Sequence, residues 1–324
     1  MFGICVWHLL VHGFDLKTMG TIGGGQPTYN QLLAMSILAP CVNCFMFISG
    51  YFGISFKREK VIRMFFQATF FYVLMAVVRN IHFAPAIFGE RLSYSYFLRN
   101  LLPIANNAWW FLLYYFIIMI LSPILGKGIA AISKNQFRYI LCALTIINCM
   151  GGFLNGRTGG SDLFGLLVVY LIGRYISKYH VVIGAKYLVI LYFCATTMLF
   201  CLVSILHYFS QDSFVWAMFR YSNPLIVIGA ISISLIVVGL KPHNNEIFNL
   251  LGSHCFAIYL LTEFTEGRIY SFWHEIYVTN GLFSVLAVIL GMCMVIVILD
   301  YIRQILCNPV AGKWHKLLKI DLNI

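Results

Sequence analysis

Nine stretches of the chain are apolar and are close to the length that a helix needs to cross a lipid bilayer. Such a helix takes about 20 predominantly apolar residues. A tenth apolar stretch, from Met1 to about Gly13, opens the chain. The pattern predicts an all-α, polytopic integral membrane protein of about ten transmembrane helices. The nine longer stretches lie at 32–54, 61–79, 109–126, 137–154, 163–178, 187–206, 221–240, 248–266 and 281–302.

The composition agrees with a lipid-embedded chain. Hydrophobic residues make up 61% of the 324 residues and charged residues only 10%, against about 25% charged in an ordinary globular protein. This small number of charged residues cannot cover the surface of a soluble fold. Lipid must therefore solvate much of the exterior. Because no linker or low-complexity segment divides the chain, we expect one domain over 1–324.

The opening apolar stretch is too short to span a membrane, because 13 residues supply roughly 20 Å of helix against about 30 Å of hydrocarbon. It lacks the basic flank and the small-residue cleavage site of a signal peptide. The simplest account is that the numbering begins inside the first transmembrane helix. We therefore expect roughly 10–20 further residues before Met1.

The Lys and Arg residues divide unequally between alternate loops, 15 in one set and 7 in the other. The positive-inside rule makes the larger set cytoplasmic, so both termini lie inside and the number of spans is even. The net charge of +11 is scattered between apolar spans, which favours membrane orientation over a nucleic-acid partner. The larger set is Lys57, Arg58, Lys60, Arg63, Lys127, Lys134, Arg138, Arg174, Lys178, Lys186, Lys241, Arg303, Lys313, Lys316 and Lys319.

Ionisable residues within spans are costly, so His8 and His12 are candidates for chemistry. They are four residues apart and share one face of a helix. Histidine acts as a general base near neutral pH. Two histidines could also form part of a metal site, but no third ligand is obvious, and we expect no metal site here. The alternative is that His12, beside Gly13, is an interfacial residue at a helix end, with His8 lying deeper.

The stretch FMFISGYF at 45–52 is followed by a basic cluster. Ser49 and Gly50 allow close approach of helix backbones, which by itself predicts packing. The basic cluster comprises Lys57, Arg58 and Lys60. These cations either anchor the cytoplasmic end of a span or bind the phosphates of an anionic cofactor.

The longest loop, 80–108, lies on the outer side and ends at Trp109 and Trp110. These aromatic residues form either an interfacial belt or a surface on which a sugar stacks.

Charged residues also occur in the last two spans. Glu263, Glu266 and Arg268 form either a local ion pair or a group of hydrogen-bonding residues for sugar hydroxyls. Asp300 and Arg303 are three residues apart, and we predict that they form a surface ion pair.

Several function classes lack their signatures. The chain has no Walker A motif, no dinucleotide-binding glycine pattern and no G-x-S-x-G elbow, which argues against an ATP-driven pump, a dinucleotide enzyme and a serine hydrolase. Few charges lie inside the spans, which weakens the case for an ion-coupled transporter.

Four sequence stretches resemble the bacterial acyltransferase 3 family, which includes O-antigen and other cell-surface sugar O-acetyltransferases. The resemblance covers essentially the whole chain. The second and third stretches together are fairly specific. In chain order the stretches are ICVWH at 4–8, FMFISGYF at 45–52, WFL at 110–112 with LSPIL at 121–125, and FAIYL at 256–260.

The resemblance implies a multi-pass enzyme of a bacterial cytoplasmic membrane. It would transfer an acyl group, by default acetyl, from cytoplasmic acyl-CoA to a hydroxyl of an envelope glycan or glycolipid. His8 matches the family histidine and would act as the general base. The family arginine about ten residues before it would fall before Met1. Thr262 stands where a histidine is common, whereas Glu263 and Arg268 match the family pattern.

The resemblance also assigns supporting roles. The basic cluster would bind acyl-CoA, and direct transfer and an acyl-enzyme both stay open, as does the oligomeric state. The alternatives are a transporter or flippase for a lipid-linked glycan, without acyl transfer, and a structural membrane subunit. Residues expected to bind or support the acceptor are His12, Ser49, Trp110, Glu263 and Arg268.

Overall fold

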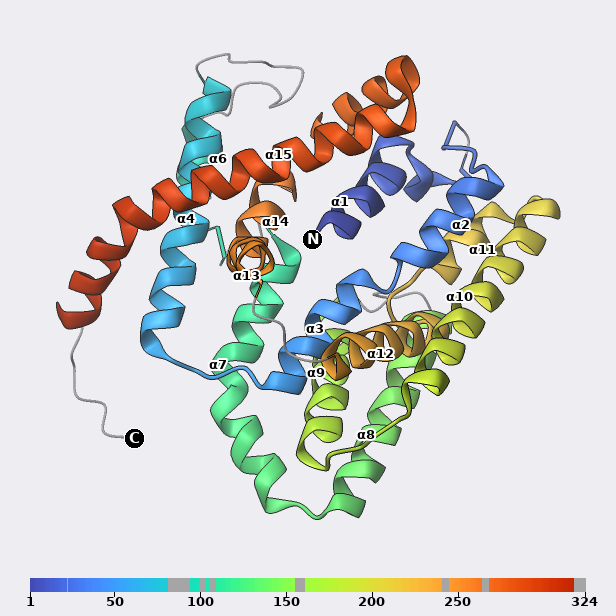
Figure 1. The fold of residues 1–324 in the computed structure, drawn as a ribbon, viewed down its shortest axis with the longest axis horizontal. Helices are drawn as coiled ribbons and strands as arrows, with labels where there is room; N and C mark the ends of the chain where they lie inside the picture. The colour runs from blue at the N-terminus through green and yellow to red at the C-terminus, as the bar shows by residue number, and fades with distance from the viewer. Residues whose placement is uncertain are drawn as a thin grey trace. The chain divides into compact units, whose positions relative to one another are not determined.

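The computed structural model describes residues 1–21, 23–80, 94–99, 103–104, 109–154, 161–240, 245–263 and 268–317 (Figure 1). Within these ranges all regular structure is helical. The helices are α1 (Phe2–His8), η1 (Leu9–Gly13), η2 (Leu16–Thr18), α2 (Tyr29–Leu38), α3 (Cys41–Phe52), α4 (Arg58–Asn80), α6 (Tyr94–Arg99), α7 (Trp110–Ala131), α8 (Lys134–Asn148), η3 (Cys149–Leu154), α9 (Leu163–Lys178), α10 (Ala185–Tyr208), α11 (Asp212–Met218), α12 (Pro224–Gly239), α13 (Glu246–Ser253), α14 (Cys255–Glu263) and α15 (Arg268–Leu317).

Five helical segments among the described residues are long and apolar enough to cross a membrane, judged by length and composition. Shorter apolar helices accompany them at Phe2–Gly13 and Pro224–Gly239. The prediction of an all-α polytopic membrane protein is therefore confirmed. The five segments are Tyr29–Phe52, Arg58–Asn80, Trp110–Ala131, Ala185–Tyr208 and Ile269–Cys307.

Several predicted spans differ from single straight helices, and the 137–154 span is divided between α8 and the π-helical η3. The 32–54 span is interrupted between α2 and α3 beside Pro40, which lacks the N–H that an unbroken helix requires. The 248–266 span divides into α13 and α14 at His254, just after Gly252 and Ser253, a small-residue pair of the kind that kinks helices. The 281–302 span belongs to the longer α15, which is broken at Gly281 (φ 82°, ψ 179°).

The chain forms two compact units, each built from separate stretches of sequence. Unit 1 comprises residues 1–5, 56–116 and 244–324, and unit 2 comprises residues 6–55 and 117–243. Each unit has its own means of holding its helices together.

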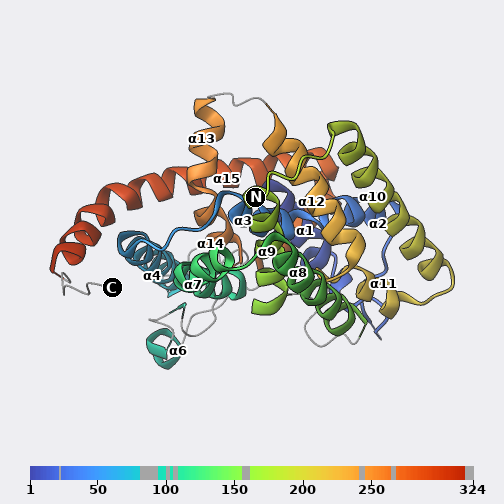
Figure 2. The same cartoon turned by 90° about the horizontal axis from the view of Figure 1, so that it is seen from below.

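Unit 2 is built around a close crossing of α3 and α9. A Cβ atom added at Gly50 would lie 2.2 Å from the carbonyl oxygen of Tyr170, and one added at Gly173 would lie 2.4 Å from that of Phe47. Only glycine fits at such a distance, so the predicted packing role of the Ser49–Gly50 pair is confirmed for Gly50. Helix α8 also packs against α9 (Figure 2).

A second part of unit 2 is an apolar core shared by α1, η1, η2, α2, α10, α11 and α12. Its buried side chains include Trp7, Leu32, Leu199, Phe219 and Ile226. The Trp7 and Phe219 rings meet edge to face with their centroids 5.9 Å apart. This contact anchors the helix that carries His8.

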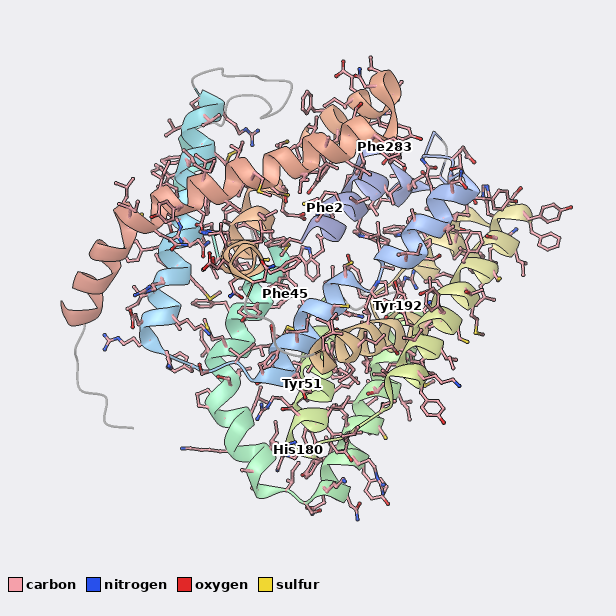
Figure 3. The ribbon with its side chains drawn as sticks, in the orientation of Figure 1. Phe2, Phe45, Tyr51, His180, Tyr192 and Phe283 are labelled. Carbon is pink, nitrogen blue, oxygen red and sulfur yellow. The ribbon has the colours of Figure 1, made fainter. Side chains whose placement is uncertain are left out.

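Unit 1 joins α4, α14 and α15, and Figure 1 shows α15 crossing α4. The start of α7 also belongs to this unit: the buried Trp109 indole donates a 3.0 Å hydrogen bond to the carbonyl oxygen of Leu260. The Phe111 ring packs edge-on against Tyr259, with centroids 5.9 Å apart. Beyond the break at Gly281, Phe283 is 89% exposed (Figure 3).

Candidate functional site

His8 lies where α1 changes into the π-helical turn η1. Its side chain is buried, and its ring lies edge-on to that of His12 with centroids 5.7 Å apart. The two histidines thus share a face, as their four-residue spacing predicts. Single π-turns within helices recur at functional sites. A buried imidazole in this position is chemically suited to accept a proton from a hydroxyl group.

Ser49 lies on α3, the helix marked by Phe45 and Tyr51 in Figure 3. Its hydroxyl donates a 2.9 Å hydrogen bond to the carbonyl oxygen of Phe45, four residues earlier in the same helix. The Ser49 hydroxyl proton is therefore used in a hydrogen bond within α3.

The basic cluster surrounds the start of α4. Lys57 precedes the helix, while Arg58 and Lys60 lie in its first turn; both lysines are exposed and Arg58 is half-buried. Glu59 forms an exposed 2.5 Å ion pair with Arg63, one turn further on. Because the start of a helix carries partial positive charge, three cations there create a surface suited to phosphate groups.

The predicted acceptor residues of unit 1 have different surroundings. Trp110 begins α7, is half-buried and lies edge-on to Phe111, with ring centroids 5.8 Å apart. Glu263 ends α14 and accepts a 3.3 Å hydrogen bond from the hydroxyl of the buried Tyr270. Arg268 begins α15, but its side chain, Glu266 and most of the 80–108 loop lie outside the described residues.

The predicted surface position of the Asp300–Arg303 pair is wrong. The pair exists, with Nε of Arg303 2.5 Å from Oδ1 of Asp300, but Asp300 is 0% and Arg303 5% exposed. The i,i+3 spacing correctly indicated the contact, whereas the packing of α4 and α14 against α15 buries it.

Asp300 is the centre of a hydrogen-bond network that joins α4 and α15 to the break between α13 and α14. Its Oδ2 lies 2.5 Å from Nδ1 of His254. Two amides complete the set: Gln67 on α4 donates to Oδ1 at 3.3 Å and Gln304 donates to Oδ2 at 3.2 Å. With Arg303, four donors occupy the roughly four lone-pair sites of the carboxylate. The network, hereafter the Asp300 network, comprises Gln67, His254, Asp300, Arg303 and Gln304.

The sequence contains a signal for this network in the uncharged polar residues of the predicted spans. Gln67 and His254 each lie inside a predicted span, as Asp300 does. Polar side chains in spans normally face the protein interior and find one another. Pairing every polar residue within the spans, rather than only the charged ones, would have identified these three as candidates for a shared contact.

Unit 2 holds another histidine–carboxylate contact that sequence inspection missed. Nδ1 of His207, at the end of α10, lies 2.7 Å from Oδ1 of Asp212 at the start of α11. The Tyr29 ring lies edge-on to the His207 ring with centroids 5.5 Å apart. The two residues flank a short turn, so local sequence alone gives little sign of their pairing.

The predicted site residues fall into both units. His8, His12 and Ser49 belong to unit 2, whereas the basic cluster, Trp110 and Glu263 belong to unit 1. Among these residues, His8 and His12 are in ring contact with each other.

A comparison with protein families gives the chain its class. A model of an acyltransferase domain, that of the acyltransferase 3 family, matches residues 1–303. Together with the helical fold, this match defines a multi-pass membrane acyltransferase. The chain belongs to the acyltransferase 3 family. No curated protein and no solved structure matches it.

Proposed function

We propose that the protein transfers an acyl group, acetyl by default, from acyl-CoA to a hydroxyl group of a cell-envelope glycan or lipid-linked glycan. It would do so in the cytoplasmic membrane of a bacterium, with both termini and the basic cluster on the cytoplasmic side. The family match over residues 1–303 is the observation that carries this proposal. The buried His8, next to His12 in a π-turn, supplies the candidate base.

In the proposed reaction His8 removes the proton from the acceptor hydroxyl. The hydroxyl oxygen attacks the thioester carbonyl carbon, a new C–O bond forms, and the C–S bond breaks. The electron pair of that bond leaves with sulfur, and the thiolate takes up the proton that His8 accepted. A sugar hydroxyl is a poor nucleophile, so removal of its proton is the step where a base contributes most.

The test follows labelled acetyl-CoA into envelope polysaccharide in membranes from cells that express the chain. General-base catalysis contributes about 10²–10⁴-fold, so His8→Gln should reduce transfer by that order at equal protein level. His180→Gln is the matched control, because it removes an exposed imidazole of the same unit that has no part in the proposed site, and it should retain most of the activity. Equal transfer by wild type and His8→Gln would exclude His8 as the base. No transfer by wild type would favour a glycan transporter or a donor other than acetyl-CoA.

The basic cluster is tested separately. Replacing Lys57, Arg58 and Lys60 with glutamine should raise the KM for acyl-CoA and leave the KM for the acceptor unchanged, because phosphate contacts contribute to donor binding. The matched control replaces Lys127, Lys134 and Arg138 with glutamine. These substitutions remove the same amount of positive charge from another predicted cytoplasmic loop. An equal rise in both variants would show that only the overall charge matters.

A further inference from the structure

Unit 1 contains an apolar cavity of about 260 Å³ between α4, α14 and α15. All the side chains that line it are apolar, and α4, α14 and α15 all contribute to them. Its lining includes Leu74 and Val78 on α4, Leu261 on α14, and Val295, Ile296 and Leu299 on α15.

The Asp300 network marks one end of this cavity. On α4, Gln67 precedes the lining residue Leu74 by seven residues. His254 precedes Leu261 by seven, and on α15 Arg303 follows Ile296 by seven. Seven residues are about two helical turns, or roughly 10 Å. The same offset on three segments therefore places the polar network beyond one end of an apolar pocket whose lining includes the 56% exposed Val295.

The network retains hydrogen-bonding capacity after Asp300 is satisfied. Among the described residues, the guanidinium of Arg303 contacts Asp300 through Nε. The other four N–H donors of the Arg303 guanidinium make no hydrogen bond to any residue that the structure describes. Both hydrogen-bond contacts of His254 involve Nδ1. Because Nδ1 donates to a carboxylate, Nε2 of the neutral ring is an acceptor. The remaining N–H donors of Arg303 can therefore bind a carbonyl oxygen, whereas Nε2 of His254 can accept a hydrogen bond from a donor group.

An acyl thioester has this combination of a hydrocarbon chain and a carbonyl at one end. We propose that the cavity holds the acyl chain of the donor, with its thioester end toward Arg303 and His254. The proposal rests on the proposed acyl transfer and deepens it, because it names the donors as acyl-CoA molecules with chains longer than acetyl. The C-terminal end of α15, which is rich in basic residues in the sequence and is predicted to be cytoplasmic, follows Arg303. The CoA part of the donor would therefore stay at the cytoplasmic end of the cavity.

The decisive experiment compares hexanoyl-CoA with acetyl-CoA as donors. Val78→Trp fills the cavity, whereas Val77→Trp adds the same side chain at a neighbouring position that is 51% exposed. Each buried methylene contributes a factor of about four to binding. We therefore expect the ratio of hexanoyl to acetyl transfer to fall about tenfold or more in Val78→Trp and to stay unchanged in Val77→Trp.

Three outcomes would overturn the proposal. First, the ratio of hexanoyl to acetyl transfer could be unchanged in Val78→Trp while acetyl transfer persists. Second, the ratio could fall equally in Val78→Trp and Val77→Trp. Third, wild type could transfer acetyl but not hexanoyl or any other acyl chain longer than acetyl. Transfer of no acyl group from any acyl-CoA by wild type is a different result, because it rejects the proposed function itself.

A labelling experiment on the wild-type chain covers the case in which Val78→Trp does not fold. A fatty acyl-CoA with a diazirine on its chain should label α4 and α15 peptides that contain cavity residues, and excess unlabelled hexanoyl-CoA should prevent this labelling. Labelling of these peptides that hexanoyl-CoA does not reduce would show that a membrane lipid occupies the cavity instead. Absence of labelling there would also reject the proposal.

Discussion

The two units hold their helices together by opposite means. In unit 2, α3 and α9 cross so closely at Gly50 and Gly173 that backbone meets backbone. In unit 1, α4, α14 and α15 meet around the buried Asp300 carboxylate and leave an apolar cavity between them. Small residues give a contact that any added atom disrupts, whereas a buried charge gives a contact that depends on every partner being present.

The largest expected effect comes from removing the carboxylate. Asp300→Ala leaves the buried Arg303 without its counter-charge, and breaking a buried pair in this way costs about 3–5 kcal/mol. We expect a lower melting temperature in detergent and faster hydrogen exchange in α4, α14 and α15 than in α3 and α9. Asp300→Asn keeps one acceptor oxygen and should lose less. An unchanged melting temperature for Asp300→Ala would show that the network is not structurally important.

The reciprocal change attacks unit 2. Gly173→Leu places a side chain where Cβ alone would lie 2.4 Å from a backbone oxygen, and overpacking typically costs about 1–3 kcal/mol or more. Hydrogen exchange should rise first in α3 and α9. Gly128→Leu is the control, since nothing lies within 4 Å of its added Cβ. Equal destabilisation by both substitutions would contradict the account of the crossing.

A smaller effect separates backbone strain from packing within unit 1. Gly281 has a φ of 82° and a ψ of 179°, and nothing lies within 4 Å of an added Cβ. Gly281→Ala should therefore destabilise by about 1–3 kcal/mol through strain alone. Gly291→Ala, in the helical interior of α15 with equally open space, should stabilise by about 0.5–1 kcal/mol. The opposite signs of the two melting-temperature shifts are the result to check.

The smallest effect concerns a local cap outside both contacts. The Thr28 hydroxyl accepts from the Gln31 N–H at 3.3 Å, and the Gln31 side chain accepts from the Thr28 N–H at 2.8 Å. Thr28→Ala should cost about 1 kcal/mol. Thr279→Ala removes a hydroxyl that donates only within its own helix and should change the melting temperature little. A larger shift for Thr279→Ala would reverse this ranking.

The sequence indicated the helical segments well because hydrophobic length is a local property. It placed α9 at 163–178, the range that the structure shows. It did not separate α13 from α14, because the break at His254 accompanies a contact with Asp300, 46 residues away. It also did not anticipate the short α11, which is stabilised by tertiary packing in the apolar core.

The candidate site was less predictable for the same reason. The shared face of His8 and His12 follows from their spacing alone, so it could be foreseen. The burial of Asp300 depends on Gln67 from α4 and on His254, which are far away in sequence. Residue spacing predicts which side chains are neighbours on the same helix. It does not predict which other helix packs over those side chains and buries them.

The hydrogen bond from Trp109 to Leu260 has a consequence for how the protein is made. Its partners are 151 residues apart, and the carbonyl oxygens in the last turn of a helix lack N–H donors from within that helix. At roughly 5–20 residues per second of synthesis, the indole waits on the order of 8–30 s for this acceptor. The C-terminal turn of α14 is thus completed by a segment that entered the membrane much earlier, and the order of insertion is part of what shapes unit 1.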